Sequence, residues 1–168
     1  MNKTLDDLRN RRSIRRYKPE QITREELDEV LSAGVCAPTG MNRQSPIIVA
    51  VQDKETVKLL SKMNAAVMGA SSDPFYGAPT VLVVLADAHS KHAVPDGSLV
   101  MGNLMNAAQS LGVASIWIHR AKEEFESGFG KKLLADLGIE GEYEGIGHCA
   151  LGYAAEPAKE PAARNDHY

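Results

Sequence analysis

The apolar residues of the chain gather into four short runs that are rich in β-branched side chains. Runs of this kind are typical of β-strands buried on both faces of a sheet. They predict strands over residues 46–51, 80–86, 113–118 and 145–151. Between them, apolar residues recur at helical spacing and predict helices over 54–63, 98–111 and 131–137.

Two more helices are predicted before the first strand. Thr4 and Asp7 resemble a capping box, so a short first helix should lead into a basic segment. Thr23 and Glu26 form a second capping box, and Pro38 forces the chain out of the helix that begins there.

The order of the elements indicates an α+β or α/β protein in which helices cover a mixed sheet. We expect one domain over residues 1–168, with residues 153–168 as an extended arm rich in Ala, Glu, Pro and Lys. The helix over 98–111 has too many apolar positions for a single buried stripe. It should therefore be buried nearly all round, either in the core or in a subunit interface.

Composition and charge limit the classes of protein to which the chain can belong. The chain has 168 residues and a formal net charge of -3, and no apolar run approaches the length of a membrane span. The first residues are charged and do not resemble a signal peptide, so we expect a cytoplasmic protein. Cys36 and Cys149 lie far apart, which predicts neither a disulfide framework nor a zinc site and favours two small core residues.

The most pronounced local feature is a group of six cationic side chains within residues 9–18. A solvated basic turn, a nucleic-acid patch and a phosphate site are three possible interpretations. The nucleic-acid interpretation lacks support, because aromatic residues make up only 5% of the chain and the net charge is negative. Phosphate on a small ligand fits better, since arginine matches phosphate oxygens bidentately.

Several classes of enzyme lack their sequence signatures. The chain contains neither the glycine-rich Rossmann pattern nor the P-loop. It also contains no H-E-x-x-H motif and no G-x-S-x-G elbow. We therefore expect no metal site and no hydrolase chemistry.

Several weak motifs occur in an order that is specific when they are taken together. They are Arg11-Arg12-Ser13-Ile14-Arg15, the segment 37–44, Tyr76-Gly77-Ala78-Pro79, and Leu151-Gly152-Tyr153 followed by Arg164. In this order the chain resembles the nitroreductase family over essentially its whole length. The resemblance implies an α+β fold with a mixed central sheet surrounded by helices in three layers, α/β/α. It also implies an intertwined homodimer with FMN at the subunit interface.

The resemblance also implies cofactor-binding roles for residues near both chain ends. Arg11, Arg12 and Ser13 would hold the FMN phosphate and ribityl chain, and Arg164 would join them on the phosphate. Arg15 would lie near the pyrimidine edge of the flavin. A cation there would stabilise the negative charge of the reduced ring.

Further contacts are implied around the ring. The segment that reaches the flavin from the other subunit would comprise Pro38, Thr39, Gly40 and Asn42. Asn64 would bond the polar edge of the flavin, while Ile118 and His119 would lie around its reactive part.

The activity implied is an FMN-dependent oxidoreductase. Hydride would pass from NADH or NADPH through flavin N5 to a small electrophilic acceptor, such as a nitroaromatic or a quinone, in a ping-pong cycle. No catalytic side chain is then required. Two alternatives stay open: a flavin storage or sensor protein without efficient turnover, and a nucleic-acid binder that uses the basic segment.

Overall fold

The computed structural model describes residues 2–165. Its elements in chain order are α1 (Lys3–Asn10), α2 (Arg24–Val35), the 3-10 turn η1 (Gly40–Asn42), β1 (Ile47–Val51), α3 (Lys54–Met68), β2 (Thr80–Asp87), α4 (Ala93–Ser110), β3 (Ala114–Ile118), α5 (Ala121–Glu126), α6 (Gly128–Asp136) and β4 (Tyr143–Gly152). All four strands predicted from the sequence are present. Helix α5 was not predicted, because its six residues are too few to establish a helical period.

The four strands form one sheet in the order β1-β2-β4-β3. Every neighbouring pair of strands is antiparallel. A parallel bridge between Ser13 and Ser115 attaches the N-terminal segment to β3. With this bridge the sheet is mixed, as expected, although the four strands by themselves are antiparallel.

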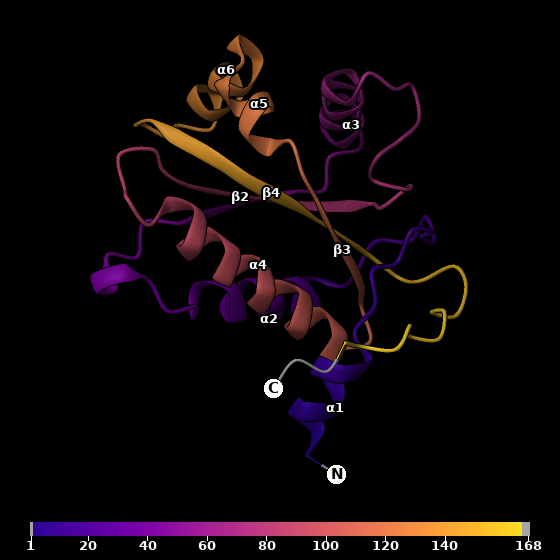
Figure 1. Cartoon of the computed structure of the whole chain (residues 1–168). Helices are drawn as coiled ribbons and strands as arrows, with labels where there is room; N and C mark the ends of the chain where they lie inside the picture. The colour runs from indigo at the N-terminus through magenta and orange to yellow at the C-terminus, as the bar shows by residue number, and fades with distance from the viewer. Residues whose placement is uncertain (1, 166–168) are drawn as a thin grey trace.

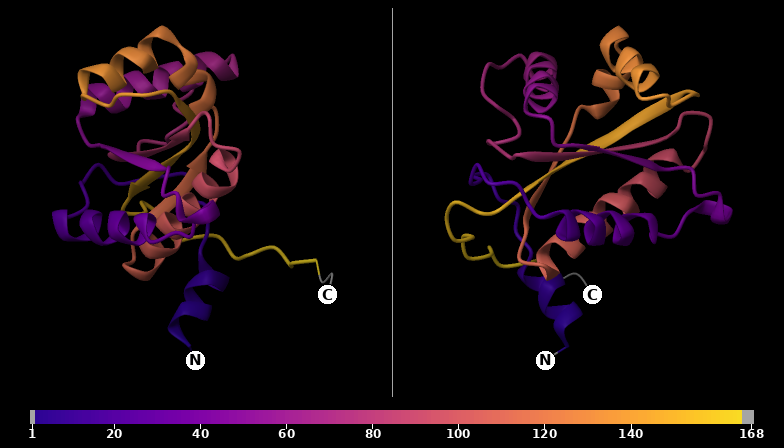
Figure 2. Two further views of the ribbon diagram at one scale, coloured as in Figure 1. Left: turned by 90° about the vertical axis from the view of Figure 1, so that its left-hand side faces the viewer. Right: turned by 180° about the vertical axis from the view of Figure 1, so that it is seen from behind.

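Helices cover both faces of the sheet. Figures 1 and 2 show α3, α5 and α6 on one face and α2 and α4 on the other, with the sheet between them. The expected three-layer α+β arrangement is therefore confirmed. Helix α1 lies apart from these layers, near the end of α4 (Figure 1).

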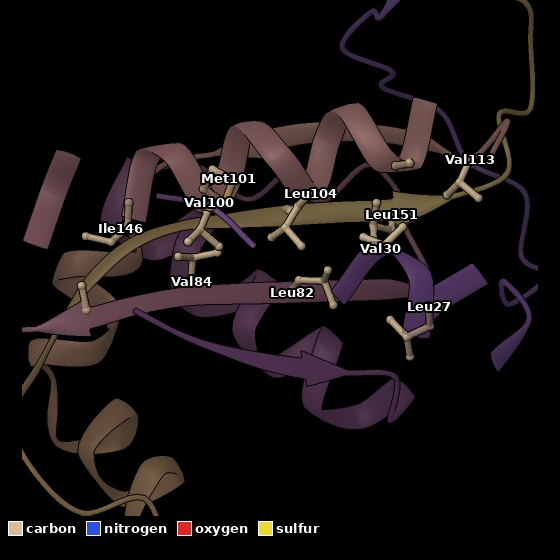
Figure 3. Packing of buried hydrophobic residues seen from close by; sticks show 14 of the residues in the cluster. Leu27, Val30, Leu82, Val84, Val100, Met101, Leu104, Val113, Ile146 and Leu151 are labelled. Atoms are coloured by element: carbon tan, nitrogen blue, oxygen red, sulfur yellow. The ribbon is translucent and has the colours of Figure 1, made fainter. Parts of the chain in front are cut away.

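Each face of the sheet has its own hydrophobic cluster. Leu82 of β2 and Leu104 of α4 belong to the cluster under α2 and α4, which Figure 3 shows from close by. Leu60 of α3 and Phe125 of α5 belong to the opposite cluster. Because these side chains are almost completely buried, each stabilises the fold by about 1.5–3 kcal/mol relative to exposure.

The helix ends agree with most of the sequence signals. Both hydrogen bonds of the Thr23–Glu26 capping box are present. Gly112 and Gly138 have positive φ angles of 76° and 71° just after α4 and α6, as expected of C-terminal caps. At α1 the prediction was wrong, since Asn2 is the N-cap and accepts a hydrogen bond from the Leu5 N–H.

Two predictions of burial are corrected, and a third stays open. Strand β1 lies at an edge of the sheet and is only partly buried, although Ile48 packs against one hydrophobic cluster and Ile47 and Val49 against the other. On α4, Leu99 is 48% exposed in the single chain, so the core alone does not bury this helix all round, and burial in a subunit interface stays a prediction. Cys149 is buried as predicted, whereas Cys36 is exposed at the end of α2.

One glycine sets the distance between β4 and α5. A Cβ added at Gly145 would lie 2.2 Å from the backbone carbonyl oxygen of Ala121, the first residue of α5. No side-chain rotation could relieve this contact, because the neighbouring atoms belong to the main chain. Gly145 therefore lets α5, and the residues just before it, approach the sheet.

The chain after β4 follows the N-terminal segment before it leaves the sheet. Tyr17 and Ala154 form a bridge, and the Ala155 N–H donates to the Arg16 carbonyl at 3.0 Å. Residues 155–165 are exposed and contain no helix or strand. Residues 166–168 of the expected arm lie outside the described residues, as does residue 1.

Within residues 2–165, no helix is both long and apolar enough to cross a membrane. The cytoplasmic location and the single domain stay predictions.

Candidate functional site

The basic N-terminal segment and the C-terminal arm enclose a cavity of about 420 Å³. Four of the predicted site residues line it: Arg12, Ser13, Arg15 and Arg164. The fold thus brings Arg164 beside residues that are about 150 positions earlier in the sequence. Lys159 adds a fifth polar donor to the lining, and two glutamates of the arm lie there as well.

Two guanidinium groups at this end of the molecule have buried nitrogen atoms without a hydrogen-bond partner among the described residues. They are Nη1 of Arg11 and Nε of Arg12. Arg12 Nη1 folds back and donates to the carbonyls of Arg9 and Arg11 at 2.8 and 2.7 Å. A buried cationic donor without an acceptor is costly. Both side chains are half-buried as a whole, so the rest of each guanidinium group, rather than these two buried atoms, would have to bind an anionic ligand such as the phosphate of FMN. Arg12 lines the cavity, whereas Arg11 lies beside it without lining it.

The basic segment lies against the start of β3. The Ile14 N–H donates to the Ser115 carbonyl at 3.1 Å, next to the Ser13–Ser115 bridge. Strand β3 is at the edge of the sheet. The backbone N–H and C=O groups of successive residues point to opposite sides of a strand. Those of Trp117 therefore point away from β4, in the same direction as those of Ser115. This edge can bind an extended ligand.

Ile118 and His119 lie at the other end of β3. Four residues of extended chain separate Ser115 from His119, which is about 13 Å. Ile118 is buried and His119 is exposed. A ligand whose phosphate lies at the basic segment can therefore follow β3 and place its far end near these residues.

Asn64 lies close to this end of β3 but is fully buried. Its Nδ2 donates to the His119 carbonyl at 2.8 Å, and its Oδ1 accepts from Arg120 Nε at 2.9 Å. A flavin cannot touch a side chain without exposed surface. We therefore remove Asn64 from the residues expected to contact the cofactor.

Sequence reasoning missed a buried polar cluster next to Asn64. Glu124 of α5 accepts a hydrogen bond from Asn64 Nδ2, and His148 of β4 places its Nε2 3.0 Å from Glu124 Oε2. Both ionisable side chains are almost completely buried. They come from separate elements at no recognisable spacing, so no motif could have revealed them.

The predicted residues of the loop after α2 lie at the opposite end of α4. The Gly40 N–H donates to the buried carboxylate of Asp96 at 2.8 Å. The Gln44 N–H donates to Thr39 Oγ1 at 3.0 Å, and Gln44 Nε2 donates to Asn42 Oδ1 at 3.0 Å. Pro38 precedes this network and is exposed.

The backbone of this loop is strained. Met41, Asn42 and Gln44 have φ angles of 56°, 53° and 51°. A left-handed backbone is uncommon for residues other than glycine and is concentrated at functional sites. The hydrogen bonds to Thr39 and Asp96 hold the loop in this shape.

The two groups of predicted residues do not meet within one chain. Lys3 Nζ donates to the Ser110 carbonyl at the last turn of α4, whereas Gly40 is bonded to Asp96 in the first turn. The fourteen residue steps from Asp96 to Ser110 correspond to a helical rise of about 21 Å. Within one chain, the loop and the N-terminal helix that leads into the basic segment therefore lie at opposite ends of α4.

A larger cavity, of about 900 Å³, lies between α3 and the loops that precede β2. Its lining includes Lys54, Lys58 and Lys62 of α3, together with Pro19 and Pro79. None of the predicted site residues lines it. Its size alone assigns no ligand to it.

The nitroreductase family model matches residues 8–153. A protein of Archaeoglobus fulgidus provisionally named NADH dehydrogenase/NAD(P)H nitroreductase is 34% identical over 123 residues, which cover 70% of this chain and 68% of that protein. The FMN reductase [NAD(P)H] of Bacillus subtilis is 31% identical over 118 residues, which cover 69% of this chain and 45% of that protein.

Solved structures agree over nearly the whole chain. A nitroreductase with bound FMN from Bacteroides fragilis superposes with a TM-score of 0.88 at 27% identity, covering 98% of this chain and 96% of that one. A nitroreductase with bound FMN from Desulfitobacterium hafniense gives a TM-score of 0.87 at 29% identity, covering 98% and 95%. From this fold and the matched sequence, the chain belongs to the nitroreductase family.

Proposed function

We propose that the protein is an FMN-dependent NAD(P)H oxidoreductase. The observation that carries this proposal is the cavity of about 420 Å³ beside the start of the β3 edge, which is lined by Arg12, Ser13, Arg15 and Arg164. The two similar structures that contain FMN and the NAD(P)H-dependent relatives support it. Bound FMN would accept a hydride from NADH or NADPH and pass it to a small electrophile, such as a nitroaromatic or a quinone, in a ping-pong cycle.

The chain's own residues would bind and orient this cofactor. Arg11, Arg12, Ser13 and Arg164 hold the phosphate through charge-assisted hydrogen bonds. Arg15 lines the same cavity and is exposed. It is free to turn from the phosphate toward the pyrimidine edge, where a cation stabilises the charge of the reduced ring.

The ring would lie at the other end of β3. The exposed imidazole of His119 would be available to the ring, whereas Ile118, which is buried in the core, would contribute through its backbone only. The residues there position the ring and exclude water, which is the protein's part in hydride transfer.

The protein acts as a homodimer in this proposal. Pro38, Thr39, Gly40 and Asn42 of one subunit would complete the cofactor site of the other. Within one chain Gly40 is bonded to the first turn of α4, whereas Lys3, just before the basic segment, is bonded to its last turn, about 21 Å away along the helix. Large apolar side chains are exposed along this part of the molecule and offer a surface for a second copy. They include Val35, Met41, Val94 and Leu99.

An absorbance spectrum of the purified protein tests the proposal, followed by anaerobic addition of NADH and then NADPH. Flavin bands that bleach support the oxidoreductase. Bands that persist with both nucleotides indicate a storage or sensor protein instead. Absence of flavin bands after incubation with FMN contradicts the cofactor assignment.

Sedimentation of the holoprotein tests the dimer. A matched experiment mixes two variants, Arg11→Ala and Gly40→Trp, whose defects lie in the two halves of the composite site, at an FMN concentration that leaves Arg11→Ala without cofactor and therefore inactive. Restored activity in the mixture is expected, because one of the two sites in a heterodimer then has both halves intact. A mixture as inactive as its components contradicts the shared site.

A further inference from the structure

The peptide that joins His119 to Arg120 is held from inside the protein. Asn64 Nδ2 donates to the His119 carbonyl at 2.8 Å, and Asn64 Oδ1 accepts from Arg120 Nε at 2.9 Å. Arg120 has a φ of 77°, which is left-handed backbone and unfavourable for arginine. One buried amide thus fixes both the direction of a peptide and the base of a guanidinium group.

Asn64 is itself fixed by the buried cluster. Its Nδ2 also donates to Glu124, which is 1% exposed, and Glu124 Oε2 lies 3.0 Å from Nε2 of His148. The ring of Phe75 packs on His148 with a centroid separation of 5.2 Å. Residues from α3, α5 and β4 therefore restrain the amide of Asn64, and none of them has surface for a ligand to touch.

The direction of the held peptide has a consequence for the open side of β3. In a trans peptide the carbonyl and the N–H point in opposite directions. Because the His119 carbonyl points inward to Asn64, the Arg120 N–H points outward. No acceptor among residues 2–165 takes this N–H. The half-buried Arg120 side chain begins at the same place.

We propose that Asn64, held by the buried carboxylate of Glu124, is a positioning residue that directs the N–H and the guanidinium of Arg120 toward the ring end of the cofactor site. This inference rests on the proposed FMN function. Donors fixed in advance stabilise charge that appears during a reaction, at no cost of reorientation. Reduction of the flavin adds such charge, so Arg120 should favour the reduced form over the oxidised form.

A merely structural cluster would hold α3, α5 and β4 together without affecting the flavin. The distinguishing measurement is the midpoint potential of the bound flavin in the holoprotein, alongside its FMN dissociation constant. The main variant is Asn64→Ala. Its matched control is Asn103→Ala, which also removes an amide donor from a backbone carbonyl, that of Ala33 at 2.9 Å, but on α4.

In Asn64→Ala the reduced flavin should lose at least tenfold more affinity than the oxidised flavin. For a two-electron couple, this ratio lowers the midpoint potential by about 30 mV. Asn103→Ala should keep the wild-type potential. An unchanged potential in Asn64→Ala with FMN bound would overturn the proposal.

Two further variants keep the inference testable if Asn64→Ala does not fold. Arg120→Gly suits the left-handed backbone, keeps the N–H and removes the guanidinium, so its potential should fall. Glu124→Gln replaces one of the two carboxyl oxygens with an amide nitrogen, which weakens the hold on Asn64 and should also lower the potential, whereas Glu123→Gln on the exposed side of α5 should not. Wild-type potentials in both Arg120→Gly and Glu124→Gln overturn the proposal. A wild-type protein that binds no FMN would instead refute the proposed function.

Discussion

Replacement of Arg11 by alanine gives the most direct test of the phosphate site. Nη1 of Arg11 is buried and has no partner within the described part of the chain. In the cofactor-free protein this buried donor costs free energy, whereas in the complex the accessible part of the half-buried guanidinium group would bind a phosphate oxygen. The same substitution should therefore weaken FMN binding without destabilising the cofactor-free protein.

The magnitude follows from the type of contact. A hydrogen bond to a charged group contributes about 1.5–3 kcal/mol. Since 1.4 kcal/mol corresponds to a tenfold change in affinity, Arg11→Ala should raise the FMN dissociation constant about ten- to a hundredfold. The free energy of unfolding of the cofactor-free variant should equal or exceed that of the wild type, because an unsatisfied buried donor has been removed.

Riboflavin provides the internal control, because it has the ring and the ribityl chain but no phosphate. Titration of cofactor-free wild type and Arg11→Ala with both flavins, followed by flavin fluorescence, measures four dissociation constants. Only the dissociation constant of FMN from Arg11→Ala should differ from the wild-type value. Arg9→Ala, in the same basic segment but with an exposed side chain, should bind both flavins as the wild type does. Equal weakening of FMN and riboflavin by Arg11→Ala would refute the phosphate contact.

Three other predictions concern packing and ionisation. Gly145→Ala should destabilise the fold by about 1–3 kcal/mol in urea denaturation, because a Cβ meets the main chain of α5; a wild-type midpoint would contradict this. Burial raises the pKa of Cys149 to about 12, so a thiol reagent at mildly alkaline pH should modify exposed Cys36 quickly and Cys149 only on unfolding. The hydrogen bond from Tyr153 lowers the pKa of Glu26. This hydrogen bond stabilises the fold above the ordinary pKa of 4.5, and its contribution is lost as the pH falls through the lowered pKa of Glu26. Tyr153→Phe should therefore make the free energy of unfolding fall less steeply at acidic pH, and parallel curves for variant and wild type would disprove this.

Local patterns predicted the elements of this fold because local forces create them. The apolar run of β2 is continuous in the sequence, and residues 80–86 are all buried between two helical layers. The capping box at Thr23 needs only four consecutive residues, and both of its bonds form. The edge position of β1 could not be predicted, because it depends on which strands pair with β2.

The candidate site was harder to predict because its parts are far apart in the sequence. The arginine-rich segment indicated a phosphate site on chemical grounds alone. Its cavity with Arg164 depends on how the chain turns after β4. The burial of Asn64 follows from Glu124 and Arg120, which lie about 60 residues away. No local signal distinguishes such a buried amide from one exposed to a ligand.

The position of β4 also affects how the protein is made. This strand is the last in the chain, yet it lies between β2 and β3. During synthesis β3 has no strand to pair with, and one edge of the very apolar β2 stays open, until residue 152 has been added. Contacts between distant parts of a chain form slowly and leave apolar surface exposed in the meantime. A nascent chain that stops short of β4 should therefore depend on chaperones and be prone to aggregation.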